Sequence, residues 1–180
     1  MSNFQAVRYP RRDNDFINDL RKRVNAYFKE NEIDKYANTE MKVKTVFMIL
    51  LYLTPYFLML FGVVTGAVGT MLMYTLIGLG IAGIGLGIMH DANHGAYSKK
   101  QKVNDRIGQV LNFVGGHAVT WKIQHNVLHH SFTNIDGMDE DIDPGPIMRF
   151  NPHKKRYGLH RLQHLYGWFI YGLMTFFWLT

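Results

Sequence analysis

The 180-residue sequence contains no cysteine. Thiolate metal ligands, iron–sulfur clusters and disulfide bonds are therefore excluded for these residues, and cysteine usage assigns no redox compartment. The basic N-terminal residues are not followed by a short apolar segment and a small-residue cleavage site, so we expect no secretory signal peptide. Any metal site in this chain must be built without cysteine sulfur.

Charged side chains are missing from a long central stretch. The 45 residues Thr45–Met89 contain no Asp, Glu, Lys or Arg. An apolar helix needs about 20 residues to cross roughly 30 Å of hydrocarbon, so the stretch is too long for one span and fits two. It predicts a transmembrane helical hairpin with spans at Val46–Val64 and Val68–Met89. The glycines between residues 78 and 87 favour close helix packing or leave room for a substrate chain.

Basic residues flank this stretch on both sides. Ten Lys and Arg precede Thr45 and ten follow Met89, whereas the turn at residues 65–70 has none. By the positive-inside rule, both flanks are expected to be cytoplasmic and the turn to lie on the opposite side. Membrane topology therefore explains the formal net charge of +6, and we expect no nucleic-acid partner.

The N-terminal region, residues 1–44, is polar and mixed in charge. Its apolar residues recur at helical spacing beside three consecutive basic residues, which predicts an amphipathic helix near the membrane face. The apolar positions are Phe16, Leu20, Val24 and Phe28. The alternative interpretation is a surface that docks a partner or anionic lipid.

Histidines gather in two clusters after the uncharged stretch. His-Asp-Ala-Asn-His begins at residue 90, and His-Asn-Val-Leu-His-His begins at residue 125. In an α-helix, His90 and His94 share one face with their Cβ atoms roughly 5 to 6 Å apart. His125 and His129 share a face in the same way, while His130 is expected to point about 100° away.

The two clusters indicate a transition-metal site. Neutral imidazole binds iron, zinc, copper and nickel, and ionisable pairs at a membrane boundary are usually functional because they are costly. Asp91 stands where a His-Glu-x-x-His zinc protease has its general-base Glu, which argues against that chemistry. The Glu-x-x-His pattern of soluble di-iron bundles is also missing, so the histidines must carry the site.

A short apolar stripe lies between the two clusters. It consists of Ile107, Val110, Leu111 and Val114. This pattern predicts a short helix that lies in the membrane interface or dips back into the protein, ending near Gly115.

The acidic loop at residues 131–143 allows two interpretations. It is either a solvated loop or one that contacts a metal ligand or an electron donor. Four further histidines, His117, His153, His160 and His164, match neither cluster, and we expect them to face water. The aromatic-rich run at Leu165–Thr180 predicts the start of a third membrane span.

These patterns together predict an all-α, multi-pass membrane protein with four regions. They are a cytoplasmic amphipathic N-terminal region (1–44), a transmembrane helical hairpin (45–89), a cytoplasmic histidine-rich helical region (90–164) and the start of a third transmembrane helix (165–180).

The histidine clusters and their surroundings resemble a known family, the membrane fatty-acid desaturases with three histidine boxes. His-Asp-Ala-Asn-His is similar to the first box, and His-Asn-Val-Leu-His-His is similar to the second. The flanking Trp121, the Thr-Asn at residues 133–134, the Asp-Glu-Asp-Ile at 139–142 and the final Tyr-Gly-Leu-Met segment are similar to the bacterial branch related to linoleoyl-CoA desaturases. The resemblance covers essentially the whole chain.

This resemblance implies a centre of two non-haem iron ions that uses dioxygen to remove hydrogen from two adjacent methylenes of a long acyl chain. The substrate would be an acyl-CoA or an acyl lipid in the bilayer, and electrons would come one at a time from a ferredoxin or a cytochrome. Carried over position by position, the resemblance makes His90, His94, His125, His129 and His130 iron ligands.

The third box of the family, a Gln-x-x-His-His, and its last spans are not present in these residues. We therefore expect the chain to be the N-terminal part of a longer enzyme and to be inactive by itself. Two alternatives stay open: a di-iron enzyme that hydroxylates acyl chains, and a metal-binding membrane protein without catalysis.

Overall fold

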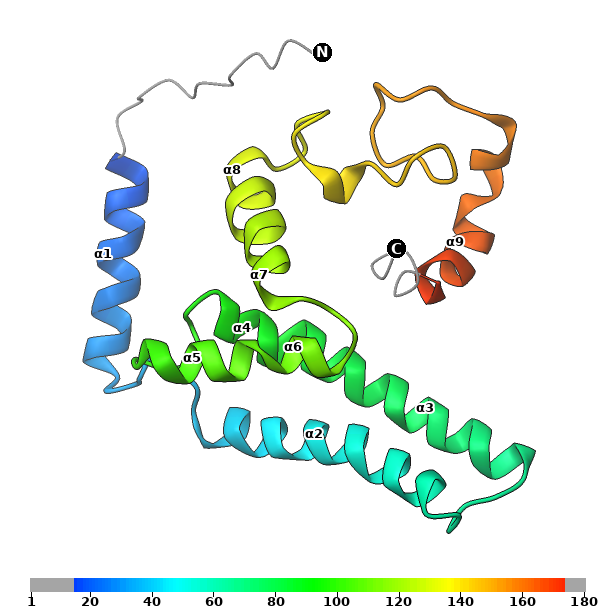
Figure 1. The fold of residues 1–180 in the computed structure, drawn as a ribbon. Helices are drawn as coiled ribbons and strands as arrows, with labels where there is room; N and C mark the ends of the chain where they lie inside the picture. Colours follow the sequence, from blue (N-terminus) through cyan, green and yellow to red (C-terminus); the bar gives the residue numbers. More distant parts are fainter. Residues whose placement is uncertain (1–14, 174–180) are drawn as a thin grey trace. The chain divides into compact units, whose positions relative to one another are not determined.

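The computed structural model describes residues 15–173, and within them every regular element is a helix (Figure 1). The chain divides into two compact units, Met1–Lys35 and Tyr36–Thr180. Within residues 15–173, two helices are long and apolar enough to cross a membrane, judged by length and composition. The all-α fold class predicted from the sequence is therefore confirmed for the described residues.

The first unit contains α1 (Asp15–Glu30), where the sequence predicts an amphipathic helix. None of its residues is buried, and the apolar side chains of Phe16 and Leu20 are exposed. Arg23 pairs with Asp19 one turn earlier at 2.8 Å, a contact that supports the helix on its polar face. Residues 1–14 of the predicted N-terminal region lie outside the described residues.

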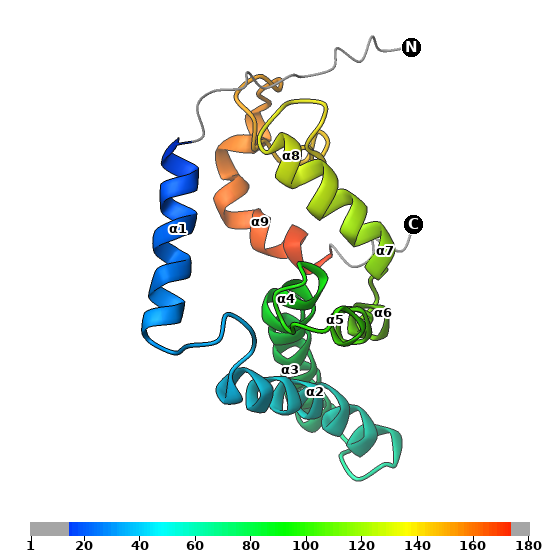
Figure 2. The same cartoon turned by 90° about the vertical axis from the view of Figure 1, so that its left-hand side faces the viewer.

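The second unit begins with a helical hairpin. α2 (Thr39–Leu60) packs along α3 (Ala67–Gly83); Figure 1 shows the pair lengthwise, and Figure 2 shows it closer to end-on. The Asn38 side chain accepts a hydrogen bond from the Met41 backbone N–H at 2.9 Å and so caps α2. In the turn, Gly66 has a φ of 84°, a conformation that favours glycine.

α3 continues without a break into the first histidine cluster. Its last turns become the π-helix η1 (Ile84–Met89) and return to α-helix in α4 (His90–Asn93). The result is one helix of 27 residues, Ala67–Asn93. It carries His90 in its last turn, at the position that the sequence predicts.

The ends of the first helix differ from the predicted span. α2 begins at Thr39 instead of Val46, because the Asn38 cap starts the helix before the uncharged stretch. It ends at Leu60 instead of Val64, because the chain turns at Gly62, which has a φ of 68°.

The two helices approach most tightly at Gly80. A Cβ added there would lie 2.8 Å from the backbone nitrogen of Tyr52 and 2.9 Å from its Cα, so a larger residue would force the backbones apart. A Cβ at Gly83 would collide with the Met48 side chain, whereas one at Gly78 would meet open space. Close packing is therefore confirmed as the role of Gly80 and Gly83.

A short helical layer packs against the hairpin at the end that carries the histidines. It contains α5 (Gln101–Gly108) and α6 (Val110–Phe113). Leu111 is buried in one apolar cluster with Ile84. The Tyr52 hydroxyl donates to the last carbonyl of α6 at 2.8 Å. The short helix therefore packs against the hairpin through Leu111, while Phe113 on the same helix is exposed.

The second histidine cluster lies on a helical segment of three consecutive elements: α7 (Ala118–Trp121), η2 (Lys122–His129) and α8 (His130–Phe132). The segment starts at the core, because Ala118 is buried in the same cluster as Leu111.

The chain then passes through the acidic loop into η3 (Glu140–Ile142), η4 (Gly158–Leu162) and α9 (Gln163–Gly172). The Gln163 side chain accepts from the Arg149 N–H at 3.0 Å and donates to the Arg149 carbonyl at 3.1 Å, which ties α9 to the preceding loop. Helix is therefore present where the third span is predicted to start. Residues 174–180 of that prediction lie outside the described residues.

A pair of alanine substitutions tests the close approach in the hairpin. Gly80→Ala should lower the stability of the detergent-solubilised protein by about 1–3 kcal/mol, because the added Cβ meets backbone atoms. Gly78→Ala on the same helix is the matched control and should stay near wild type. Thermal unfolding followed by circular dichroism measures both, and equal losses in the two variants would contradict this packing.

A candidate metal centre

The structure brings all five predicted ligand histidines into one cluster. His90 and His94 come from α4 and its C-terminal cap, and their ring centroids are 4.5 Å apart. His125, His129 and His130 come from the second segment. The His94 ring lies 5.2 Å from that of His125 and 4.9 Å from that of His130, so the two segments meet through their imidazoles.

The backbone of the second segment is π-helical where an α-helix is predicted. The His130 backbone N–H donates to the His125 carbonyl, five residues earlier, instead of to the residue four positions back. The wider turn brings both following histidines to His125, with ring centroids at 5.2 Å for His129 and 4.8 Å for His130. The His130 ring therefore lies in the cluster, and its plane is near perpendicular to that of His125 at 87°.

Two contacts fix the segments relative to each other. The Asn126 side chain donates from Nδ2 to the Asn93 carbonyl at 2.9 Å, which joins η2 to α4. Trp121 stacks on His125 with ring centroids 4.4 Å apart and also meets the His90 and His94 rings edge-on. The indole therefore covers one side of the cluster.

The pKa values of two histidines in the cluster are lowered. Burial lowers the pKa of His94, and the nearby imidazoles of His90 and His130 lower it further. Burial also lowers the pKa of His125, and His130 acts most strongly among its neighbours. Since metals bind the neutral imidazole, these environments favour the form that can act as a ligand.

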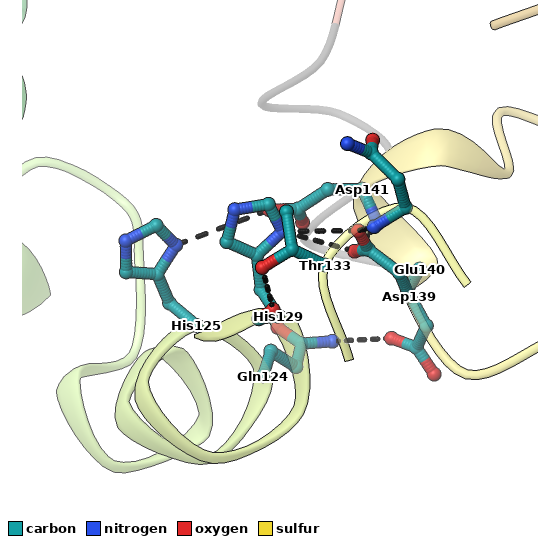
Figure 3. A network of polar contacts seen from close by, with 8 residues as sticks. Gln124, His125, His129, Thr133, Asp139, Glu140 and Asp141 are labelled. Atoms are coloured by element: carbon teal, nitrogen blue, oxygen red, sulfur yellow. Dashed lines mark hydrogen bonds and ion pairs between the residues drawn. The ribbon is translucent and has the colours of Figure 1, made fainter. Parts of the chain in front are cut away.

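The acidic loop takes part in the site through Asp139 (Figure 3). Its side chain is fully buried, and its two oxygens lie 3.0 and 3.2 Å from His129 Nδ1. Burial opposes ionisation, but hydrogen bonds from the Asn134 N–H, from His129 and from the Asp141 N–H outweigh it and hold the pKa of Asp139 below its usual value. A solvated loop is therefore the wrong interpretation for Asp139, because its carboxylate contacts a histidine of the cluster.

The other carboxylates of the loop are more exposed. Asp141 lies 3.2 Å from His129 Nδ1 and 3.9 Å from His125 Nδ1. Asp136 and Asp143 pair with Lys154 at 3.3 and 2.8 Å, and this contact lowers the pKa of Asp143. The Lys154 pairs therefore join these two carboxylates to the segment that follows the loop.

Two overlapping groups of side chains have the geometry to hold a metal ion. His90, His94 and His125 form one, and His125, His129 and Asp141 form the other, with ligand atoms in each group within 4.8 Å of one another. His125 belongs to both. Imidazole nitrogens with a carboxylate oxygen suit iron and other transition metals, so the residues present fit the predicted kind of centre.

The remaining histidines lie outside this cluster. His117 caps α7, where its Nδ1 accepts from the Thr120 N–H at 3.3 Å. His160 Nδ1 accepts from the Tyr157 N–H at 3.2 Å and its Nε2 lies 2.9 Å from the Pro146 carbonyl, so the prediction that His160 simply faces water is wrong. His153 and His164 are exposed, as predicted.

A cavity of about 840 Å³ lies beside the cluster. Trp121 and His125 form part of its wall, and further walls come from apolar residues near α9, among them Met148 and Ile170. Its acidic lining includes Asp141. An apolar chain that entered this cavity would therefore lie directly against the imidazole cluster.

Comparisons with known proteins agree with this geometry. Residues 65–180 match the family model described as "Fatty acid desaturase". The chain is 34% identical over 164 residues to the sn-1 linoleoyl-lipid 6-desaturase of Arthrospira platensis, covering 91% of this chain and 44% of that protein. It is 33% identical over 159 residues to the protein of the same name from Synechocystis, covering 88% and 44%.

A third relative comes from Physcomitrium patens. The chain is 35% identical over 165 residues to the acyl-lipid (8-3)-desaturase of Physcomitrium patens, covering 89% of this chain and 34% of that protein. The chain thus spans less than half the length of each of these relatives. No solved structure matches it.

Replacing the shared histidine tests the two overlapping groups. His125→Ala leaves neither group complete, whereas His90→Ala leaves the second group intact. Titration of the purified protein with Co²⁺, followed by its visible absorption, should show high-affinity binding weakened roughly 10-fold or more for His125→Ala and retained in part for His90→Ala. The exposed His164→Ala is the control, and equal effects of His90→Ala and His125→Ala would contradict the shared position.

Proposed function

This chain belongs to the fatty acid desaturase family, and we propose that it forms the N-terminal part of an acyl-lipid desaturase. The observation that carries the proposal is the convergence of five imidazoles from two separate segments at the end of an apolar helical hairpin. An oxidation site beside the membrane suits a substrate whose reactive carbons lie within the bilayer.

The proposed ligands of two iron ions are His90, His94, His125, His129 and His130. Neutral imidazoles suit iron, and the lowered pKa values of His94 and His125 favour that neutral form. Iron held there would supply the reduction of dioxygen that drives oxidation of the acyl chain. We propose that the remaining ligands come from parts of the protein outside these 180 residues, since the matched residues cover 44% of each of the first two relatives.

The proposed reaction removes two hydrogens from adjacent methylenes and leaves a carbon–carbon double bond. Two electrons from a ferredoxin or a cytochrome and two protons complete the reduction of one dioxygen to two waters. In this proposal, the histidines of this chain bind the metal and Trp121 excludes water from one side of the cluster. The cavity beside His125 positions the acyl chain. Removal of water protects the oxidising centre from side reactions.

The proposed topology places the site on the cytoplasmic side. α2 and the helix Ala67–Asn93 would span the bilayer, and the turn near Gly66 would face the opposite side. This orientation rests on the basic residues that flank both spans and on their absence from the turn. The substrate would be a long acyl chain on a membrane lipid, as the names of the relatives indicate for those proteins, or on CoA.

Expression of the whole protein in a host without this activity tests the proposal. Gas chromatography with mass spectrometry of the cellular acyl chains should reveal a new double bond. His129→Ala should abolish it, with at least about 100-fold less product, because the variant lacks a proposed ligand. His164→Ala is the matched control, since that side chain is exposed and lies outside the cluster.

Two other outcomes would contradict the proposal. Hydroxylated acyl chains without new double bonds would assign oxygen insertion instead of desaturation. Metal binding without any change in the acyl chains would assign a binding protein without catalysis.

A further inference from the structure

We propose that Asp139 is the positioning residue of His129: its buried carboxylate accepts the Nδ1–H of that imidazole and leaves Nε2 as the atom that binds metal. The inference rests on the proposed metal centre and assigns a role to a residue that lies nine positions beyond the second histidine cluster. It follows from the burial of Asp139, from its hydrogen bonds and from the chemistry of imidazole.

The buried carboxylate of Asp139 accepts several hydrogen bonds. Its side chain has 0% exposure, and it accepts the Asn134 N–H at 2.7 Å and the Asp141 N–H at 3.1 Å. The two backbone donors hold the carboxylate in one orientation, with both oxygens within 3.2 Å of His129 Nδ1. A carboxylate with these partners is occupied by hydrogen bonds and serves to fix its neighbour.

The local sequence explains how the carboxylate reaches His129. Thr133 donates its hydroxyl to the His129 carbonyl at 2.6 Å, which closes the helix end. Asn134 then takes a φ of 63°, a left-handed conformation that asparagine tolerates better than most residues. The chain reverses there, and Asp139 returns to the helix as the N-cap of η3.

An ionised carboxylate only accepts hydrogen bonds, whereas a neutral imidazole carries one N–H and one free lone pair. Contact with Asp139 therefore places the proton of His129 on Nδ1 and the lone pair on Nε2. Ligand histidines in metal sites commonly donate their second nitrogen in this way, which fixes ring orientation and strengthens the ligand.

Asp141 has a different position. It is half exposed and lies near Nδ1 of both His129 and His125, at 3.2 and 3.9 Å. If Asp141 were a metal ligand together with these two Nδ1 atoms, His129 Nδ1 would have to bind the metal and could not donate to Asp139. The two arrangements exclude each other, and the buried Asp139 with its two backbone hydrogen bonds favours donation.

A double-mutant cycle with Co²⁺ as the probe tests this role in the whole detergent-solubilised protein. Asp139→Asn should weaken Co²⁺ binding about 10- to 100-fold, because the amide cannot hold the Nδ1 proton as the carboxylate does. In the His129→Ala background the same substitution should cause no further loss, since Asp139 acts through His129. Asp136→Asn in the same loop is the matched control and should bind as wild type.

A comparison of two Asp139 variants distinguishes a positioning role of its carboxylate from a purely structural role in packing. Asp139→Glu keeps the carboxylate but adds a methylene to a buried site, whereas Asp139→Asn keeps the shape and loses the charge. Positioning predicts that Glu recovers more Co²⁺ affinity than Asn, and a purely structural role predicts the reverse order. The visible spectrum of bound Co²⁺ should change with Asn and return toward wild type with Glu.

Three results would overturn the proposal. They are unchanged Co²⁺ binding in Asp139→Asn, an equal loss in the His129→Ala background, and loss of binding in Asp141→Asn with none in Asp139→Asn. All use metal binding without substrate, so they are independent of the acyl-chain measurement that tests the proposed function.

Discussion

The hydrogen bond from the His130 backbone N–H to the His125 carbonyl is the constraint on which the candidate site depends. It widens the helical turn, and the three imidazoles of this segment lie with ring centroids 4.8 to 5.5 Å apart. The cluster is thus a property of the backbone as much as of the side chains it carries.

The position of the first histidine pair depends on the packing of the hairpin. His90 and His94 end a continuous helix that meets α2 at Gly80, where the two backbones come as close as an absent side chain allows. Thr45 and Tyr97 add a hydrogen bond between their hydroxyls at 2.8 Å, which ties α2 to the loop after α4. A shift of one helix along the other would therefore move two of the five imidazoles.

The sequence predicts those parts of the fold that depend on residue composition and on the spacing of side chains along a helix. The uncharged stretch predicts the hairpin, and the spacing of His90 and His94 predicts a shared face, because both follow from the local chain. The π-helical hydrogen bonding at His125–His130 could not be predicted, since the spacing of the histidines was interpreted with the period of an α-helix. The burial of Asp139 was also not predictable, because five acidic residues in a loop look solvated until the chain reversal at Asn134 is known.

The hydrogen-bonding pattern of the helix and the number of residues between the histidines of the second cluster depend on each other. In an α-helix, histidines at positions i, i+3 and i+4 share one face, whereas those at i, i+4 and i+5 do not. Deleting one residue between His125 and His129 would give His-x-x-His-His, which an ordinary α-helix aligns without any widening. The extra residue and the wide turn therefore compensate for each other, and an insertion or deletion in this segment can preserve the imidazole cluster if the helix changes its hydrogen-bonding pattern with it.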